Sequence, residues 1–294
     1  MDPLEYLHWP ASFAKLPLAS VEMAARSTRA QLAEAYRLAG LHGDVHTFFC
    51  EETGVMRFYV SSLEQLDEIA SMSTLLGIGV DLRTLNAAYI ETNMKPAEGE
   101  CLYRIKGRYA KVRLHLEQND TGQGNEFFVQ PVLGSVPPDY VRAIESGVRF
   151  RLKYGSLVGF PITGVRVTLL DGAWHEDVSS SDAFTAAARG AMADACHKAS
   201  MKIMEPIVHL RAIGANGNAN ELAELLVDAG IGSDSKESSE ILIPFAALLN
   251  GPVRAHIFPI SRSGLGIGYS HHRILPAEVH IDPETYQRVS IPTP

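Results

Sequence analysis

The 294-residue sequence has few cysteines and no long apolar segment. Its three cysteines, Cys50, Cys101 and Cys196, lie far apart and include no Cys-x-x-Cys pair, so neither a disulfide framework nor a zinc ribbon is indicated. No apolar run approaches the roughly 20 residues that a transmembrane helix needs. The N-terminus lacks the basic and apolar pattern of a secretory signal. We therefore expect a cytoplasmic protein with reduced thiols and no metal site.

Motifs for nucleotide hydrolysis are missing as well. The sequence has no Gly-x-x-x-x-Gly-Lys-Ser/Thr phosphate loop, no Asn-Lys-x-Asp guanine-binding motif and no Asp-x-x-Gly switch. The glycine-rich segment Ser263–Gly268 has no lysine and no helix pattern after it, so it predicts a turn rather than a phosphate loop. We expect no GTP hydrolysis, no catalytic residues and no bound cofactor.

The net charge of −8 is unevenly distributed along the chain. Residues 102–204 carry 13 Lys and Arg against 10 Asp and Glu, whereas residues 1–101 and 205–294 are both acidic. Within the middle part, Tyr103–Arg113 contains five cations, two tyrosines and no acid. Cations that bind phosphates, together with rings that stack on bases, are what contact with looped or single-stranded RNA requires. This segment is therefore a candidate RNA-binding site.

Local patterns predict both strands and helices, which indicates the α+β class. The pair Pro137-Pro138 begins a helix that continues through Val148, since proline is tolerated in the first turn. A second helix follows an N-cap within Ser179–Asp182. The other predicted elements are strands at 18–23, 45–49, 55–60, 162–170, near 241 and at 266–275, and helices at 28–39 and 220–229.

Four signatures follow one another between Gly134 and Pro206. They are Val136-Pro137-x-Asp139-Tyr140-Val141-x-Ala143-Ile144-Glu145-x-Gly147-Val148, then Gly155-x-Leu157-x-Gly159-Phe160-Pro161-Ile162, then Asp171-Gly172-Ala173-Trp174-His175, and finally Glu205-Pro206. This order resembles the fourth domain of elongation factor G, the translocation GTPase whose C-terminal arm enters the decoding site of the ribosome. Segments 44–47, 51–54 and 88–92 resemble the third domain of that family, and residues 207–275 resemble the fifth.

The resemblance implies an N-terminal extension (1–16), a domain III-like module (17–95), a domain IV-like module (96–204) and a domain V-like module (205–294). It implies two ferredoxin-like βαβ sandwiches, which flank a ribosomal-protein-like domain with a left-handed βαβ crossover. The polar segment Met94–Glu100 is interpreted as a linker between the first two modules. A separate GTPase would then have to supply nucleotide hydrolysis.

The resemblance also implies a partner and a site. The partner is the ribosome, through the ribosomal RNA of its decoding region, with the mRNA and tRNA bound there. Two loops at the tip of the fourth domain make the contact, and Ile105 and Ala110 replace glycines of the family, which predicts a stiffer first loop. The candidate RNA-binding residues are Arg104, Lys106, Arg108, Tyr109, Lys111, Trp174 and His175.

Alternative interpretations stay open for each loop and for the whole chain. The cations of the first loop could belong to a solvated edge strand that deters edge pairing. His175 could be an exposed side chain in a polar turn, with Trp174 as a small hydrophobic plug. The chain could also be a small-molecule kinase that reuses the left-handed βαβ fold, although Gly264-Leu265-Gly266 matches the required phosphate loop poorly.

Overall fold

The computed structural model divides into two compact units. One comprises Met1–Leu7, Lys15–Ala88 and Glu205–Pro294, and the other comprises His8–Ala14 and Tyr89–Met204. Each unit is described separately below. The structure describes residues 17–23, 37, 46–50, 55–75, 80–119, 124–130, 136–212, 240–249, 265–275, 279–281 and 288–290.

The first unit contains an antiparallel sheet with the strand order β2-β3-β1-β4. The helix α2 follows β3 directly, and Leu63, Leu66 and Ile69 on one of its faces are buried. The strand at 18–23 and the hairpin formed by 45–49 and 55–60 are thereby confirmed. The predicted helix over 28–39 falls on residues that, Arg37 excepted, lie outside the described part. The bounds are β1 Ala19–Met23, β2 His46–Cys50, β3 Val55–Val60, α2 Leu63–Leu75 and β4 Val80–Ala87.

The C-terminal part of the chain contributes a second sheet with the order β11-β10-β12 and a two-stranded sheet of β13 and β14. The predicted strands near 241 and at 266–275 are confirmed by β11 and β12. The predicted helix at 220–229 lies outside the described residues. The bounds are β10 Lys202–Ala212, β11 Glu240–Pro244, α6 Phe245–Leu249, β12 Leu265–Ile274, β13 Val279–Ile281 and β14 Arg288–Ser290.

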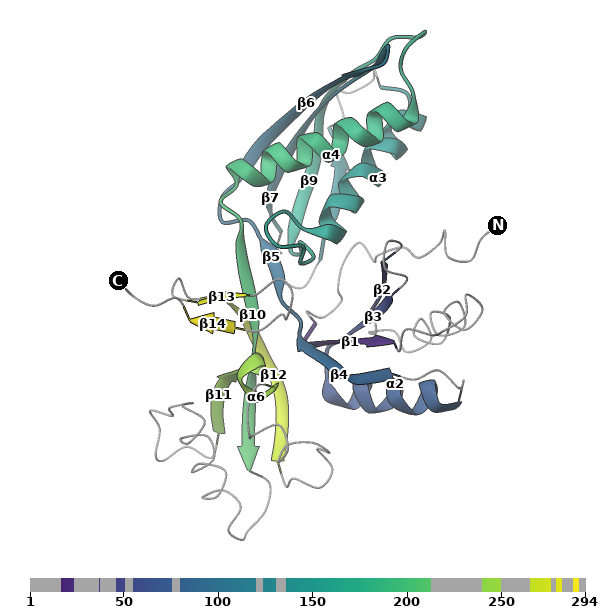
Figure 1. Ribbon diagram of the computed structural model, residues 1–294. Coiled ribbons are helices and arrows are strands. Elements are labelled where there is room, and N and C mark those ends of the chain that lie inside the picture. Colours follow the sequence, from purple (N-terminus) through teal and green to yellow (C-terminus); the bar gives the residue numbers. More distant parts are fainter. Residues whose placement is uncertain are drawn as a thin grey trace. The chain divides into compact units, whose positions relative to one another are not determined.

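The second unit is a four-stranded sheet in the order β6-β7-β9-β8, with α3 and α4 against one face (Figure 1). The strands β8 and β9 are parallel neighbours joined through α3, which makes a βαβ unit, while β6, β7 and β9 pair antiparallel. The helices predicted from Pro137-Pro138 and from Ser179–Asp182 are α3 and α4. The bounds are β5 Ile90–Thr92, β6 Ala97–Ile105, β7 Arg108–Gln118, β8 Glu126–Val129, α3 Pro138–Tyr154, β9 Val165–Ala173 and α4 Ser181–Lys198.

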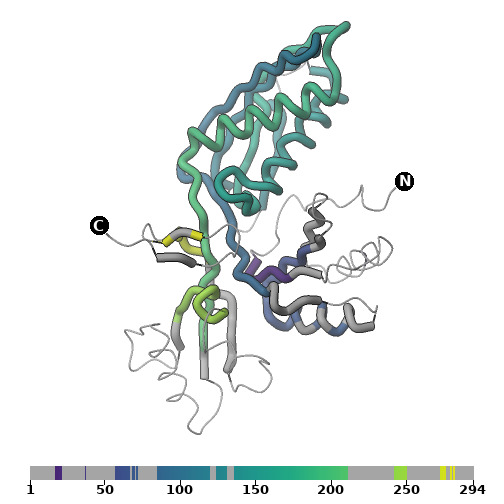
Figure 2. The backbone as a smooth tube through the Cα atoms, in the orientation of Figure 1, coloured from purple at the N-terminus to yellow at the C-terminus, as the bar shows by residue number. Residues whose placement is uncertain are grey.

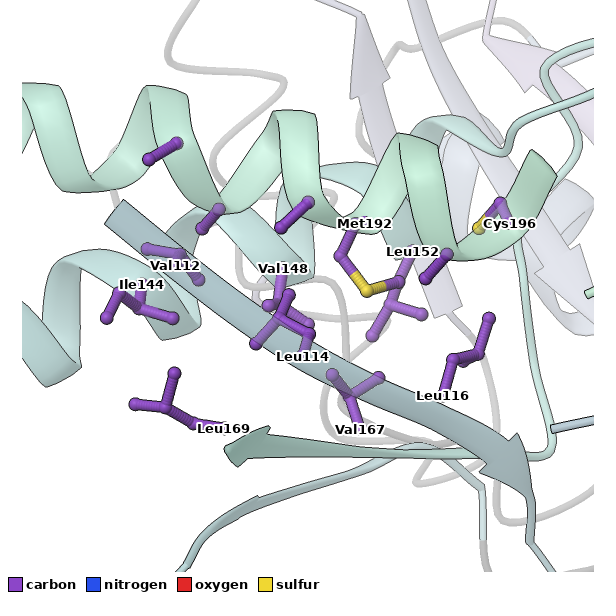
Figure 3. Packing of buried hydrophobic residues seen from close by; sticks show 14 of the residues in the cluster. Val112, Leu114, Leu116, Ile144, Val148, Leu152, Val167, Leu169, Met192 and Cys196 are labelled. Atoms are coloured by element: carbon purple, nitrogen blue, oxygen red, sulfur yellow. The ribbon is translucent and has the colours of Figure 1, made fainter. Parts of the chain in front are cut away.

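The core of this unit lies between the sheet and the two helices (Figure 3). Every second residue of β7 is buried there, from Ala110 to Leu116, as the two-residue period of a strand requires. The buried face of α4 consists largely of alanines, which lets α3 approach closely. A Cβ atom on Gly147 of α3 would lie 2.5 Å from the carbonyl oxygen of Thr185. Glycine at position 147 therefore sets the distance between the helices.

The prediction of a linker at Met94–Glu100 is wrong for residues 97–100, which belong to a strand. Residues Ala97–Glu100 begin β6 and pair with β7. Gly99 is buried and packs so closely against α4 that a Cβ atom there would clash with the backbone of Ala191. The segment has the period-two pattern of a strand, in which Glu98 and Glu100 are exposed while Gly99 faces the core. An alternation over only four residues is a weak strand signal, so the charged residues and the glycine of this segment predict a linker instead.

Glu91 anchors the loop that follows α3. Its carboxylate is fully buried and accepts hydrogen bonds from the backbone N–H groups of Ser156, Leu157 and Val158 and from the Ser156 hydroxyl, at 2.7–3.2 Å. Gly155 begins this loop with φ 67°, a conformation that favours glycine. The Gly-x-Leu-x-Gly signature is thus a loop folded around a buried carboxylate.

Candidate nucleic-acid interface

The hairpin between β6 and β7 presents the basic side chains of the first candidate loop. Ile105 pairs with Arg108, and the two residues between them, Lys106 and Gly107, both have positive φ, at 51° and 76°. This is the backbone of a two-residue turn that matches the twist of a hairpin. A lysine in the left-handed region is uncommon and is held there at a cost of about 1–3 kcal/mol. Arg104, Lys106 and Arg108 are all exposed at this turn.

The second candidate loop begins three residues later than its sequence signature. Asp171, Gly172 and Ala173 continue β9 and pair with β7, so the loop itself comprises residues 174–180. Trp174 is 38% exposed, and its ring meets the edge of Tyr140 from α3 with centroids 6.0 Å apart. Tyr140 in turn stacks on Phe184 of α4 at 4.5 Å. The indole is therefore held on one side and open to solvent on another.

The two loops lie at the same end of the unit (Figure 2). They also contact each other directly. The rings of Tyr109 and His175 meet edge to face with centroids 4.7 Å apart. The backbone N–H of Tyr109 donates to the carbonyl oxygen of Val178 at 2.9 Å. The Arg104 guanidinium lies 5.6 Å from the centre of the Tyr109 ring. We call Arg104–Tyr109 together with residues 174–180 the tip.

The structure does not place all predicted site residues alike. Lys111 lies inside β7, where its ammonium group is 3.2 Å from a Glu100 carboxylate oxygen, so it is separate from the tip as defined. Arg108 approaches Asp182 at 3.6 Å, but both side chains are largely exposed, and such pairs contribute little to stability. Lys106 forms no ion pair within the part of the chain that the structure describes. The cations of the hairpin thus remain available to an anionic partner.

Two residues that hold the tip in place were missed by the sequence prediction. The sequence places Tyr140 in the helix that begins at Pro137-Pro138 and gives it no further role. In the structure its hydroxyl donates to the carbonyl oxygen of Ser179 at 3.3 Å and its ring supports Trp174. Ser179 was interpreted as part of an N-cap, whereas Ser180 is the N-cap of α4 and accepts from the Ala183 N–H. No periodicity in the sequence marks these contacts, because they join elements far apart in the chain.

Other candidate sites are weaker in the structure. Leu265–Gly268, the end of the glycine-rich segment, belongs to strand β12 and is not followed by a helix in the described residues. A phosphate loop requires such a helix, because its N-terminal N–H groups bind the phosphate.

None of the helices that the structure describes is both long and apolar enough to span a bilayer.

The comparisons with known proteins identify the region that carries the tip. Residues 87–200 match the family model described as elongation factor G, domain IV. This region is similar to domain IV of elongation factor G. The resemblance predicted from the four signatures is thereby confirmed for this region, which we call the domain IV region. It contains α3, α4, the four strands of the sheet and the whole tip.

Two curated relatives extend this finding. The chain is 32% identical over 170 residues to elongation factor G of Paracoccus denitrificans (strain Pd 1222), which covers 55% of this chain and 24% of that protein. It is 38% identical over 130 residues to elongation factor G of Rhodopseudomonas palustris (strain BisB18), which covers 43% of this chain and 19% of that protein. The chain thus spans about a quarter or less of the length of these relatives.

A solved structure supports the same fold over a longer stretch. A protein of Thermus thermophilus superimposes with a TM-score of 0.55 and covers 89% of this chain and 41% of its own, at 24% identity. At this identity the likeness concerns the fold alone. Together with the several sheets and helices described above, it supports an α+β architecture like that of the C-terminal part of elongation factor G.

Proposed function

We propose that this chain is a non-catalytic ribosome-binding module of translation elongation, and that the tip of its domain IV region contacts ribosomal RNA in the decoding region. One observation carries the proposal. Exposed cations on the hairpin and exposed rings on the loop after β9 are joined by direct contacts, within a region that matches the domain IV family model. The same proposal includes the division into a 1–16 extension and modules at 17–95, 96–204 and 205–294. The two flanking modules are ferredoxin-like, and the middle module is a ribosomal-protein-like domain with a left-handed βαβ crossover.

The chemistry of the tip suits RNA. The guanidinium groups of Arg104 and Arg108 and the Lys106 ammonium group can bind phosphates without first breaking a buried ion pair. Trp174 presents an open indole for base stacking, and the imidazole of His175 can both donate and accept hydrogen bonds. Tyr109 lies partly buried between Arg104 and His175, so it orders the cation and the imidazole. Lys111 would act only as a more distant cation.

The shape of the hairpin agrees with a stiff probe. Ala110, which replaces a glycine of the family, is buried in β7 and cannot itself contact RNA. Ile105, which also replaces a glycine of the family, is the last residue of β6 and is 51% exposed beside the turn. Because two-residue hairpin turns are short and defined, little conformational entropy is lost when the tip binds. The ribosome, its bound mRNA and tRNA, and a separate GTPase are the partners that this proposal implies, in the cytoplasm.

Neutralising the hairpin cations tests the proposal through its salt dependence. We expect Arg104→Gln/Lys106→Gln/Arg108→Gln to lower the slope of log affinity against log salt by about two to three, since each lost phosphate contact removes about 0.7–0.9. The measurement is co-sedimentation with ribosomes between low and physiological salt. Arg142→Gln/Lys198→Gln, which removes cations paired with acids of their own helices, is the control and should leave the slope unchanged. Equal slopes for the wild type and the triple variant would count against RNA contact by the hairpin.

A further inference from the structure

Ser179 lies at the junction of the two tip loops and of α3. Its hydroxyl donates a hydrogen bond to the carbonyl oxygen of Tyr109 at 2.7 Å and accepts one from the backbone N–H of His175 at 2.9 Å. Its backbone N–H donates to the carbonyl oxygen of His175 at 3.0 Å. Its carbonyl oxygen accepts from the hydroxyl of Tyr140 at 3.3 Å. Four hydrogen bonds therefore converge on one half-buried residue.

The hydroxyl of Ser179 connects the two residues whose rings touch. A serine hydroxyl has one hydrogen to donate, and here it is given to the carbonyl oxygen of Tyr109, near the start of β7. The oxygen accepts from His175 on the other loop. Without this hydroxyl, the Tyr109 carbonyl and the His175 N–H would both lose this partner. The backbone hydrogen bond from Tyr109 to Val178 would still join the loops.

We propose that Ser179 is the positioning residue of the tip, which holds His175 against Tyr109 and thereby sets the geometry in which the tip meets RNA. The proposal rests on the proposed function. Ser179 acts from inside the tip, since its hydroxyl donates to Tyr109 and accepts from His175. It acts by keeping the imidazole of His175 and the Arg104–Tyr109 pair at a fixed separation. Preorganisation of this kind raises affinity because less freedom is lost on binding.

The neighbouring serine provides a matched control. Ser180 ends the second loop as the N-cap of α4, and its hydroxyl accepts from the Ala183 N–H at 3.3 Å, whereas the Ser179 hydroxyl bonds to the hairpin. Losing an N-cap destabilises a helix but does not free the tip. Comparing Ser179→Ala with Ser180→Ala thus separates positioning of the tip from stability of the helix that follows it.

The experiment combines ribosome co-sedimentation with nuclear magnetic resonance of the free protein. We expect Ser179→Ala to weaken ribosome binding roughly tenfold, as the loss of two hydrogen bonds implies. It should also abolish the nuclear Overhauser contact between the Tyr109 and His175 rings. Ser179→Thr, which keeps the hydroxyl, should restore both, and Ser180→Ala should change neither. In a His175→Ala background, Ser179→Ala should have a clearly smaller effect, because the two residues act through one contact.

The two readouts separate the failure of this inference from the failure of the proposed function. If the wild type does not bind ribosomes, the proposed function fails, while the ring contact in the free protein still tests the positioning role. If Ser179→Ala keeps both the ring contact and the wild-type affinity, the positioning role is wrong and the ribosomal proposal stands. If Ser180→Ala weakens binding as much as Ser179→Ala does, the effect comes from the stability of α4, and the inference is again overturned.

Discussion

Replacing Glu91 with alanine is expected to destabilise the domain IV region by about 3 kcal/mol or more, since each buried donor left without an acceptor costs about 1–3 kcal/mol. The carboxylate is fully buried and accepts from three backbone N–H groups and one hydroxyl in the loop after α3. Relaxation of the loop and entry of water recover part of the summed cost of these four donors. Ser156→Ala, which removes the hydroxyl and keeps the carboxylate, should cost only about 1 kcal/mol.

The fluorescence of Trp174 during urea denaturation, in a Trp9→Phe background, measures this effect. The thiol of Cys196 gives a second, local readout: burial raises its pKa to about 11, although a hydrogen bond with the Ser156 side chain acts in the opposite direction. The thiol is therefore protonated and slow to alkylate at about pH 8 in the folded protein. Glu91→Ala should speed alkylation of Cys196, because it loosens the loop that carries Ser156. A variant as stable as the wild type, with Cys196 still protected, would show that the loop does not need the carboxylate.

Removing both rings of the loop after β9 should have the largest effect on ribosome affinity. We expect Trp174→Ala/His175→Ala to weaken binding by about 30-fold or more, since each lost base–aromatic stack costs about 1–3 kcal/mol and 1.4 kcal/mol is a factor of ten. Unlike the variant of the hairpin cations, this one should keep the salt slope of the wild type. The measurement is co-sedimentation with ribosomes at fixed salt.

A loss of affinity is informative only if the variant is folded. Trp174 packs on Tyr140, so truncation of the Trp174 side chain also removes a contact at the first turn of α3. Trp174→Phe keeps a ring against Tyr140 and should bind within a few-fold of the wild type, and circular dichroism should show equal helix content for all three proteins. If the double variant is folded and pellets with ribosomes as the wild type does, the rings of this loop do not contact RNA.

The sequence predicted the elements of the domain IV region well because local signals and global fold agree there. Proline in the first turn defined the start of α3, the serines before Asp182 defined the start of α4, and alternation defined β9. The strands β1, β2, β3 and β12 were located from the same kind of pattern. Each of these signals lies within the element that it predicts.

Features that depend on contacts between distant residues were not predicted. The role of Glu91 requires β5 to lie beside a loop 65 residues later in the chain. The hydrogen bonds of Ser179 require the start of β7 to meet the loop after β9. The sequence predicts a linker at the beginning of β6, because only the packing of this strand against α4 shows that Gly99 is buried. The family signatures located the tip, but not how its two loops are held together.

Photocrosslinking from the tip tests the central claim most directly. p-Benzoylphenylalanine placed at Trp174 keeps an aromatic ring at an exposed position, and the same group at Leu157, which is 50% exposed in the loop after the far end of α3, is the matched control. Both proteins are irradiated on ribosomes, and the crosslinked ribosomal RNA is mapped by primer extension. We predict crosslinks in the decoding region from position 174 and none there from position 157. Crosslinks elsewhere only, or equal decoding-region crosslinks from both positions, would contradict the assignment of the tip as an RNA probe.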